Sequence, residues 1–412
     1  MAILWAMDLL KKPAAFVVLV ACCFLWLIVY QRVAPGKSHF DKWTSEEEGT
    51  FDRTIFDTSS ESPETLVYRI TDFTSVVRAV YDPRFNATAV LFLQNNWLSY
   101  DCILYDHKPT VVEKCEGIFY EERGYVKNLL AYCRSKSASF VPSYVTLMPT
   151  GNASAALLAQ ARFPMIPVEE VSPLPESEIP PDLAVCLAPL FEPTNGSNWL
   201  LLVEWIEHLR LQGATKLYIY HLRTSEASRE VLQHYIQDGI VTMVLWPGPP
   251  TCRAHYHCQY SEVNDCILRT MYKHRYAQDP SMAEVSESSL EKQLKVVSIT
   301  NGSAPVPSGS YPKSVVKPHT IEAMGVHYHA AQVNGCNKAR TPAVPQTVAH
   351  LRHYRTGLSA KFINTTAHQW GNYSIQPAPE GLARRLVENV KRVIRQLKVQ
   401  VASYQDKENR YM

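Results

Sequence analysis

The sequence predicts an α/β fold, in which a domain with a parallel-rich sheet and flanking helices follows a small β-rich domain and one N-terminal transmembrane helix. Three observations support this class. Strand-like and helix-like segments alternate between Leu183 and Trp246. Short β-favouring runs, such as Ala89–Leu93 and Tyr144–Leu147, precede them and are separated by turn residues. An uncharged apolar run, Pro13–Tyr30, lies near the N-terminus.

The alternating segment gives the strongest of these signals. Its first element, Leu183–Leu190, is a continuous apolar run of strand length, as expected for a strand covered on both faces. The elements after it are the helix Trp199–Leu211, the strand Lys216–Tyr220, the helix Ser225–Gln237 and the strand Ile240–Trp246. Glycines follow both helices, as is common at helix ends. The order implies a parallel sheet with right-handed crossovers, whose carboxyl edge favours a nucleotide ligand.

The run Pro13–Tyr30 predicts a membrane anchor. As a helix it is about 27 Å long, which matches the thickness of a secretory-pathway bilayer. A cleaved signal peptide is the competing interpretation, but its apolar region spans only about 7–15 residues and ends in small residues. This run instead ends at Val29 and Tyr30, followed by Gln31 and Arg32. We therefore expect an uncleaved anchor. The preceding residues, 1–12, form a cytoplasmic tail if the part after the anchor is lumenal.

Sequons and cysteines indicate that the part after the anchor is lumenal. About two Asn-x-Ser/Thr sites would occur by chance for so loose a motif. The six sites found are Asn86, Asn152, Asn195, Asn301, Asn364 and Asn372. Eight cysteines follow the anchor, an even number for an oxidising compartment, so we expect disulfide bonds, with the pairing left open.

Composition divides the rest of the chain. The expected parts are a polar stem (31–65), a β-rich accessory domain (66–165), a Pro-rich linker (166–182), an α/β domain (183–365) and a C-terminal helical tail (366–412). An apolar stripe in the tail predicts that its helix packs against the α/β domain. The formal net charge of +2 gives no reason to expect a nucleic-acid partner.

The order of motifs in this chain resembles glycosyltransferase family 92. The segments that carry the resemblance are VCLAPLF (185–191), WLLLVEWIEHLRLQGATKLYIYH (199–221), 235–246, SEVNDCILR (261–269), KSVVKPHTIEAMGVHYH (313–329) and HLRHYR (350–355). It implies a type II, single-pass Golgi membrane protein with a GT-A-like fold. It also implies inverting transfer of galactose from UDP-galactose to glycan acceptors on glycoproteins or glycolipids, with a divalent metal ion, Mn²⁺, as cofactor. The oligomeric state is not predicted.

The resemblance also suggests donor-site residues at strand ends. Pro189, Leu190 and Phe191 would form the floor beside the uridine, and Tyr220 would form a wall. Their alternative role is in the core and rim of the sheet. Glu204, on the first helix, is expected on a solvated face together with Glu207.

Further candidates lie in later motifs. Asn264 and Asp265 could hold the ribose or the sugar hydroxyls of the donor, although both are also common residues near helix N-termini. By resemblance, His353 would complete a metal shell and Arg355 would pair with phosphate, and a surface basic cluster is the alternative. No residue is assigned as the catalytic base.

One departure from the family is visible. An Asp-x-Asp-Glu motif on a strand should follow the helix that carries Asn264 and Asp265, because the donor diphosphate needs a metal ion. Here only Asp279 and Glu284 lie near that place, in a segment without a strand pattern. We therefore expect a missing central strand. A lumenal family member without activity, which binds glycans or a partner protein, is the alternative function. A zinc site formed by Cys252, His255, His257 and Cys258 is disfavoured relative to a disulfide or to ordinary loop residues.

Overall fold

The structure is a computed structural model. It describes residues 68–71, 74–94, 100–106, 112–115, 117–122, 127–135, 140–150, 164–191, 199–246, 258–278, 294–302, 313–325, 329–332, 344 and 360–397. They all lie in one compact unit, Ser62–Met412. The expected tail, anchor and stem, residues 1–65, fall outside these ranges. No helix within the ranges is long and apolar enough to cross a membrane, so the anchor stays a prediction.

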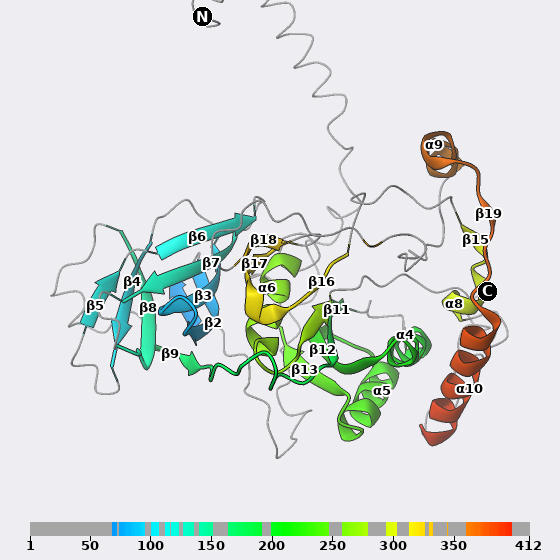
Figure 1. The fold of residues 1–412 in the computed structure, drawn as a ribbon, viewed down its shortest axis with the longest axis horizontal. Helices are drawn as coiled ribbons and strands as arrows, with labels where there is room; N and C mark the ends of the chain where they lie inside the picture. The colour runs from blue at the N-terminus through cyan, green and yellow to red at the C-terminus, as the bar shows by residue number, and fades with distance from the viewer. Residues whose placement is uncertain are drawn as a thin grey trace, which may run out of the picture. The chain divides into compact units, whose positions relative to one another are not determined.

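Two mainly antiparallel sheets form a sandwich in the first half of the described chain (Figure 1). The first sheet contains β1 (Tyr68–Thr71), β2 (Thr74–Asp82), β3 (Ala87–Gln94), β7 (Lys127–Arg134) and β6 (Gly117–Glu122), with β10 (Glu169–Glu170) beside β2. The second contains β5 (Val112–Cys115), β4 (Tyr100–Tyr105), β8 (Tyr144–Pro149) and β9 (Ile166–Pro167). Alternate residues such as Phe92 and Leu147 fill the space between the sheets.

A disulfide bond between Cys102 on β4 and Cys133 on β7 joins the two sheets. A second links Cys186 on the strand β11 (Leu183–Phe191) to Cys266 on the helix α6 (Gln259–Thr270). The expectation of disulfide bonds is confirmed.

The parallel sheet predicted from the alternating segment is present. Its strand order is β13-β12-β11-β14-β16, and all neighbours pair in parallel except β14 and β16. The remaining bounds are β12 (Ala214–Arg223), β13 (Val241–Leu245), β14 (Tyr276–Gln278) and β16 (Val315–Val316). The predicted α/β class is therefore confirmed, and the fold fits a GT-A-like domain.

The expectation of a missing central strand is wrong. Tyr276–Gln278 pairs in parallel with Leu183–Val185 of β11 and so occupies the fourth strand position. Three residues are too few to show a periodic pattern, which is why the sequence does not reveal this strand.

Helices cover both faces of the parallel sheet because its strands alternate two apolar sets. Val185, Leu217 and Ile219 pack toward the helices α4 (Trp199–Leu211) and α5 (Glu226–Gln237). Cys186 and Tyr220 face α6 and the sandwich. In Figure 1, α6 accordingly lies between the sandwich and the parallel sheet, whereas α4 and α5 lie on the opposite side.

The helix bounds follow the sequence signals closely. The structure places α4 at the predicted residues, and α5 begins after the N-cap Ser225, whose hydroxyl accepts from the Ser228 N–H. Gly213 and Gly239, just past the two helices, have φ values of +97° and +75°, which glycine adopts without the strain of a side chain.

The C-terminal helix α10 (Glu380–Gln396) packs against α4, as predicted from its apolar stripe. Leu386, Val390 and Val393 are fully buried in the same cluster as the α4 side chains. The other described elements are α8 (Lys295–Ser298), β15 (Asn301–Gly302), η4 (Pro318–Thr320), β17 (Ile321–Met324), β18 (His329–Gln332), α9 (Ala360–Trp370) and β19 (Ser374–Ile375).

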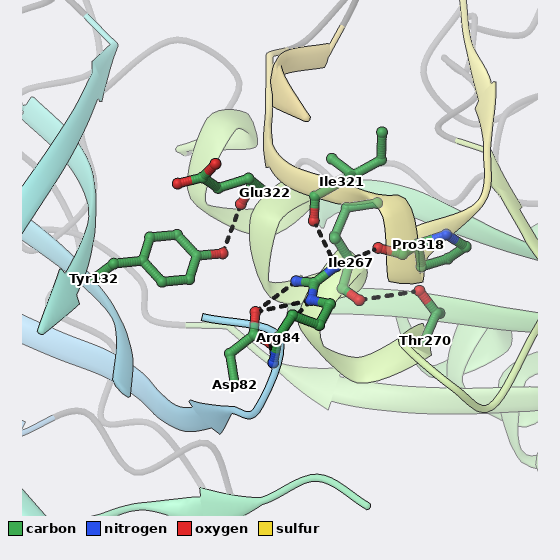
Figure 2. Close-up of polar contacts among 8 residues, drawn as sticks. All are labelled: Asp82, Arg84, Tyr132, Ile267, Thr270, Pro318, Ile321 and Glu322. Atoms are coloured by element: carbon green, nitrogen blue, oxygen red, sulfur yellow. Dashed lines mark hydrogen bonds and ion pairs between the residues drawn. The ribbon is translucent and has the colours of Figure 1, made fainter. Parts of the chain in front are cut away.

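The sandwich is tied to η4 and β17 by side chains that reach backbone carbonyls. Arg84, on the β2–β3 turn, pairs with Asp82 and donates to the carbonyls of Pro318 (3.2 Å) and Ile321 (3.0 Å). The Tyr132 hydroxyl donates to the carbonyl of Glu322 at 2.7 Å. Figure 2 shows these side chains converging on that backbone. The sandwich therefore fixes the position of η4 and β17.

Candidate functional site

The carboxyl edge of the parallel sheet holds part of the predicted donor site. Leu190 is buried in β11, and Phe191, the last residue of that strand, is 36% exposed. Phe191 is paired in register with Arg223, the last residue of β12. The Arg223 guanidinium lies over the Phe191 ring, 4.6 Å from its centroid. Pro189, Leu190 and Phe191 thus end beside a cation at the edge where ligands of such sheets bind.

Tyr220 lies on the face of the sheet that α6 covers. Its side chain is fully buried, its ring contacts Trp246 edge to face at 5.0 Å, and its hydroxyl donates to Asp265 Oδ2 at 2.6 Å. Burial, and then the charge of Asp265, hold the pKa of Tyr220 well above its usual value. The hydroxyl therefore stays protonated and acts as a donor to Asp265.

Asp265 sits at the centre of a buried ionic cluster, defined here as Arg78, Tyr220, Asp265 and Arg269. Arg269 Nε donates to Asp265 Oδ2, and Arg78 Nη1 lies 3.6 Å from Oδ1. Burial alone would raise the pKa of Asp265, but Arg269 and Arg78 outweigh it and lower that pKa. Arg78 also pairs with Glu169, so the cluster joins the sandwich, α6 and β12.

Asn264 fastens α6 to β17. Its side chain is 1% exposed, its Nδ2 donates to the Met324 carbonyl at 2.8 Å, and its Oδ1 accepts from the Met324 N–H at 2.9 Å. Nδ2 also donates to the Tyr260 carbonyl at 2.8 Å. The carboxamide therefore supplies the backbone of Met324 with the two hydrogen bonds that a neighbouring strand would give.

The structure brings Tyr220 and Asp265 into direct contact, with Asn264 next to Asp265 on α6, whereas Pro189, Leu190 and Phe191 end at the carboxyl edge. The donor-binding roles of all six remain predictions. The two late candidates, His353 and Arg355, lie outside the described residues.

The sequons are distributed over both halves of the chain. Asn86 is in the β2–β3 turn, where its Oδ1 accepts from the Tyr81 hydroxyl at 2.7 Å. Asn301 is in β15, while Asn364 on α9 and Asn372 after it are exposed. Asn152 and Asn195 are outside the described ranges. Asn364 also lines an open surface depression on α9 with Thr365, His368 and Gln369.

The expectation that Glu204 and Glu207 form a solvated face is wrong, since they are only 2% and 0% exposed. Glu204 accepts from the Val296 N–H of α8 at 2.6 Å. Glu207 accepts from the Tyr235 hydroxyl at 3.0 Å and pairs with Arg210 at 3.1 Å. Segments far away in the sequence cover this helix face, so spacing within the helix does not reveal their burial.

Burial raises the pKa of Glu204 to about 7, although the backbone N–H groups of Val296 and Lys295 favour the ionised form. Because the folded pKa is above the unfolded value, the native carboxyl binds the extra proton, and stability falls as pH rises toward 7. We expect a loss of about 2 kcal/mol in unfolding free energy between about pH 5.5 and 7.5 from this group. Glu204→Gln should abolish this pH-dependent loss when the unfolding free energy is measured by urea unfolding at a series of pH values.

The exposed Glu230, on α5, provides the control for this measurement. Glu230→Gln should retain the pH dependence of the wild-type protein, because this exposed substitution leaves the burial and the hydrogen bond of Glu204 unchanged. An unchanged pH profile in Glu204→Gln would contradict the assignment to Glu204.

The predicted metal site is not found within the described ranges. There, no group of three or more His, Cys, Asp or Glu side chains is placed to hold a metal ion. Asp279, Glu284 and His353 lie outside those ranges, so the metal ion stays a prediction. Cys258 is disulfide-bonded, which agrees with the preference for a disulfide over zinc at this cysteine.

Three arginines that contact the candidate residues were not predicted as site residues from the sequence, namely Arg78, Arg223 and Arg269. Arg269 could have been found, because it is one helical turn from Asp265 on α6. Arg78 could not, because a bulge between Val76 and Arg78 sets its direction on β2. Arg223 follows the predicted strand and became visible only through its place beside Phe191.

The parallel sheet, its covering helices and the carboxyl edge define an α/β domain that fits a GT-A-like fold. Residues 181–279 match the model of glycosyltransferase family 92, which confirms the predicted resemblance over that segment. The match extends from just before β11 to just after β14. No curated protein matches the chain.

Proposed function

We propose that this protein is an inverting hexosyltransferase that transfers galactose from UDP-galactose to glycans of glycoproteins or glycolipids. The observation that carries the proposal is the family match, which covers the four parallel strands β11–β14. The donor nucleotide would bind at the carboxyl edge of these strands, where Phe191 is partly exposed. The galactosyl donor and the inversion come from the family resemblance.

The chain's own residues would act by binding and positioning. Pro189, Leu190 and Phe191 offer an apolar floor for the uracil ring. Through Asp265, the buried ionic cluster holds Tyr220 and hence the strand β12 in place. A bound divalent ion such as Mn²⁺ would stabilise the departing UDP, but the described residues supply no ligand set for it, and no step here depends on it.

We also propose that the protein is a single-pass type II Golgi membrane protein with its catalytic part in the lumen. The apolar run at residues 13–30 and the six sequons support this orientation. A glycosidase-sensitive increase in mass, removed when the sequon asparagines are replaced by glutamine, is expected. A protein that carries no N-linked glycan when made in cells that glycosylate would contradict the lumenal assignment.

The second candidate function is the binding of glycans or of a partner protein by a lumenal protein without catalytic activity. One specific observation favours it, namely that the sequence around Asp279 lacks an Asp-x-Asp-Glu motif directly after the three-residue strand β14. A shortened strand and a missing carboxylate pair would weaken donor binding more than folding.

Isothermal titration of the full-length protein in detergent with UDP-galactose, with and without Mn²⁺, separates these candidates. The transferase proposal predicts saturable donor binding and transfer of labelled galactose to glycan acceptors. Circular dichroism of the same sample shows whether it is folded. A folded sample that binds no UDP-galactose in either condition overturns the transferase proposal and favours the second candidate function.

A further inference from the structure

We propose that Arg223 binds the diphosphate of the nucleotide-sugar donor. The inference rests on the proposed function and adds Arg223 to the residues that would recognise the donor's negative charge.

The position of Arg223 provides the first argument. The four parallel strands end at Phe191, Arg223, Leu245 and Gln278. Of these four terminal residues, Arg223 is the one that carries a charge. All four ends lie at the same edge of the sheet. A donor bound at this edge therefore meets the Arg223 side chain at the end of β12.

The geometry of Arg223 provides the second argument. Its guanidinium lies over the Phe191 ring, with Cζ 4.6 Å from the ring centroid. The N–H donors of a guanidinium lie in its plane and match the oxygens of a phosphate in a bidentate arrangement. The contact with Phe191 therefore holds a group suited to bidentate phosphate binding at the carboxyl edge of the sheet.

The chemistry of the donor provides the third argument. A leaving nucleoside diphosphate gains negative charge, which a metal ion or a fixed cation can stabilise. The sequence lacks the Asp-x-Asp-Glu motif after β14 that would hold such a metal ion. A fixed arginine at the end of β12, which β11 separates from β14, supplies a positive charge that does not depend on those carboxylates.

The alternative roles of Arg223 predict different effects on ligand affinity. If Arg223 stacked on uracil instead, its loss would weaken the binding of uridine as much as that of UDP. If it only packed on Phe191, its loss would alter stability but not the difference between these ligands. The affinity ratio between UDP and uridine therefore isolates the contact with phosphate.

The test compares the full-length wild-type protein with Arg223→Gln and Arg223→Lys, titrated with UDP-galactose, UDP and uridine. Arg223→Gln should weaken UDP and UDP-galactose about 10- to 100-fold while leaving uridine unchanged, as expected for the loss of hydrogen bonds to a charged group. Arg223→Lys keeps the charge but loses the bidentate geometry. Its affinity for UDP and UDP-galactose should therefore lie between those of the wild-type protein and Arg223→Gln.

Lys216 provides a matched control, because it lies on the same strand at the amino end and donates to the Gly239 carbonyl at 2.8 Å. Lys216→Gln removes the same unit of charge and should leave all three affinities unchanged. An equal loss in Lys216→Gln would show a general effect of net charge and overturn the assignment.

Several outcomes decide the matter. Unchanged UDP affinity in Arg223→Gln, or an equal loss for uridine, overturns the role of Arg223 while the transferase proposal stands. If Arg223→Gln does not fold, the comparison of Arg223→Lys with wild type decides, and equal UDP affinity overturns the role. A folded wild-type protein that binds neither UDP nor UDP-galactose overturns this inference together with the proposed function.

Discussion

Replacing Asp265 with alanine is expected to lower the free energy of unfolding by about 3–5 kcal/mol, because it leaves two buried guanidinium groups without their shared carboxylate. The side chains of Arg78 and Arg269 are only 8% and 10% exposed, and Asp265 itself is fully buried. The Tyr220 hydroxyl would lose its acceptor as well. Urea unfolding followed by circular dichroism measures the loss.

A second variant separates charge from cavity formation. Adding Arg78→Met to Asp265→Ala removes one of the two cations that lose Asp265 as a partner, so the double variant should lose less than the sum of the two single changes. Asp238→Asn is the surface control, because Asp238 is 42% exposed and lies 4.0 Å from Arg210, where an ion pair contributes about 0–1 kcal/mol. A loss in Asp265→Ala no larger than in this control would contradict the ionic cluster.

Asn264→Ala should cost about 2–5 kcal/mol, since it deprives both the N–H and the carbonyl of buried Met324 of their partners. The Met324 amide should also exchange with deuterium faster, because its N–H donates to Asn264 Oδ1 and this is the hydrogen bond described between that amide and α6. Hydrogen exchange resolved at Met324, together with urea unfolding, measures both effects.

Gln212→Ala is the matched control for Asn264, because its exposed amide bonds only to the His208 side chain at 2.6 Å among the side-chain bonds described for it. We expect a change within about 0.5 kcal/mol, as for ordinary surface substitutions. Unaltered exchange at Met324 in Asn264→Ala would contradict the attachment of α6 to β17.

The parallel sheet could be predicted from the sequence because its signals are local. Leu183–Leu190 is apolar throughout and α4 has an unbroken helical pattern, so the structure reproduces both within one residue. By contrast, Tyr276–Gln278 forms β14 only through pairing with β11 and β16, which no local pattern encodes.

The candidate site was harder to predict because its contacts join distant segments. Residue spacing placed Glu204 and Glu207 on one helix face but could not show that α8 and α10 cover it. Asn264 and Asp265 were singled out as polar residues near the start of a helix, whereas their hydrogen bonds to Met324 and Tyr220 depend on tertiary packing. The donor-binding role predicted for them is still to be tested.

Hydrogen–deuterium exchange of the full-length protein with and without UDP-galactose tests the central claim most directly. Donor binding at the carboxyl edge predicts slower exchange in the segments around Phe191 and Arg223, with little change in the sandwich strands β4 and β8. Protection confined to the sandwich, or no protection in a folded sample at saturating donor, would contradict a nucleotide-sugar site at this edge of the sheet.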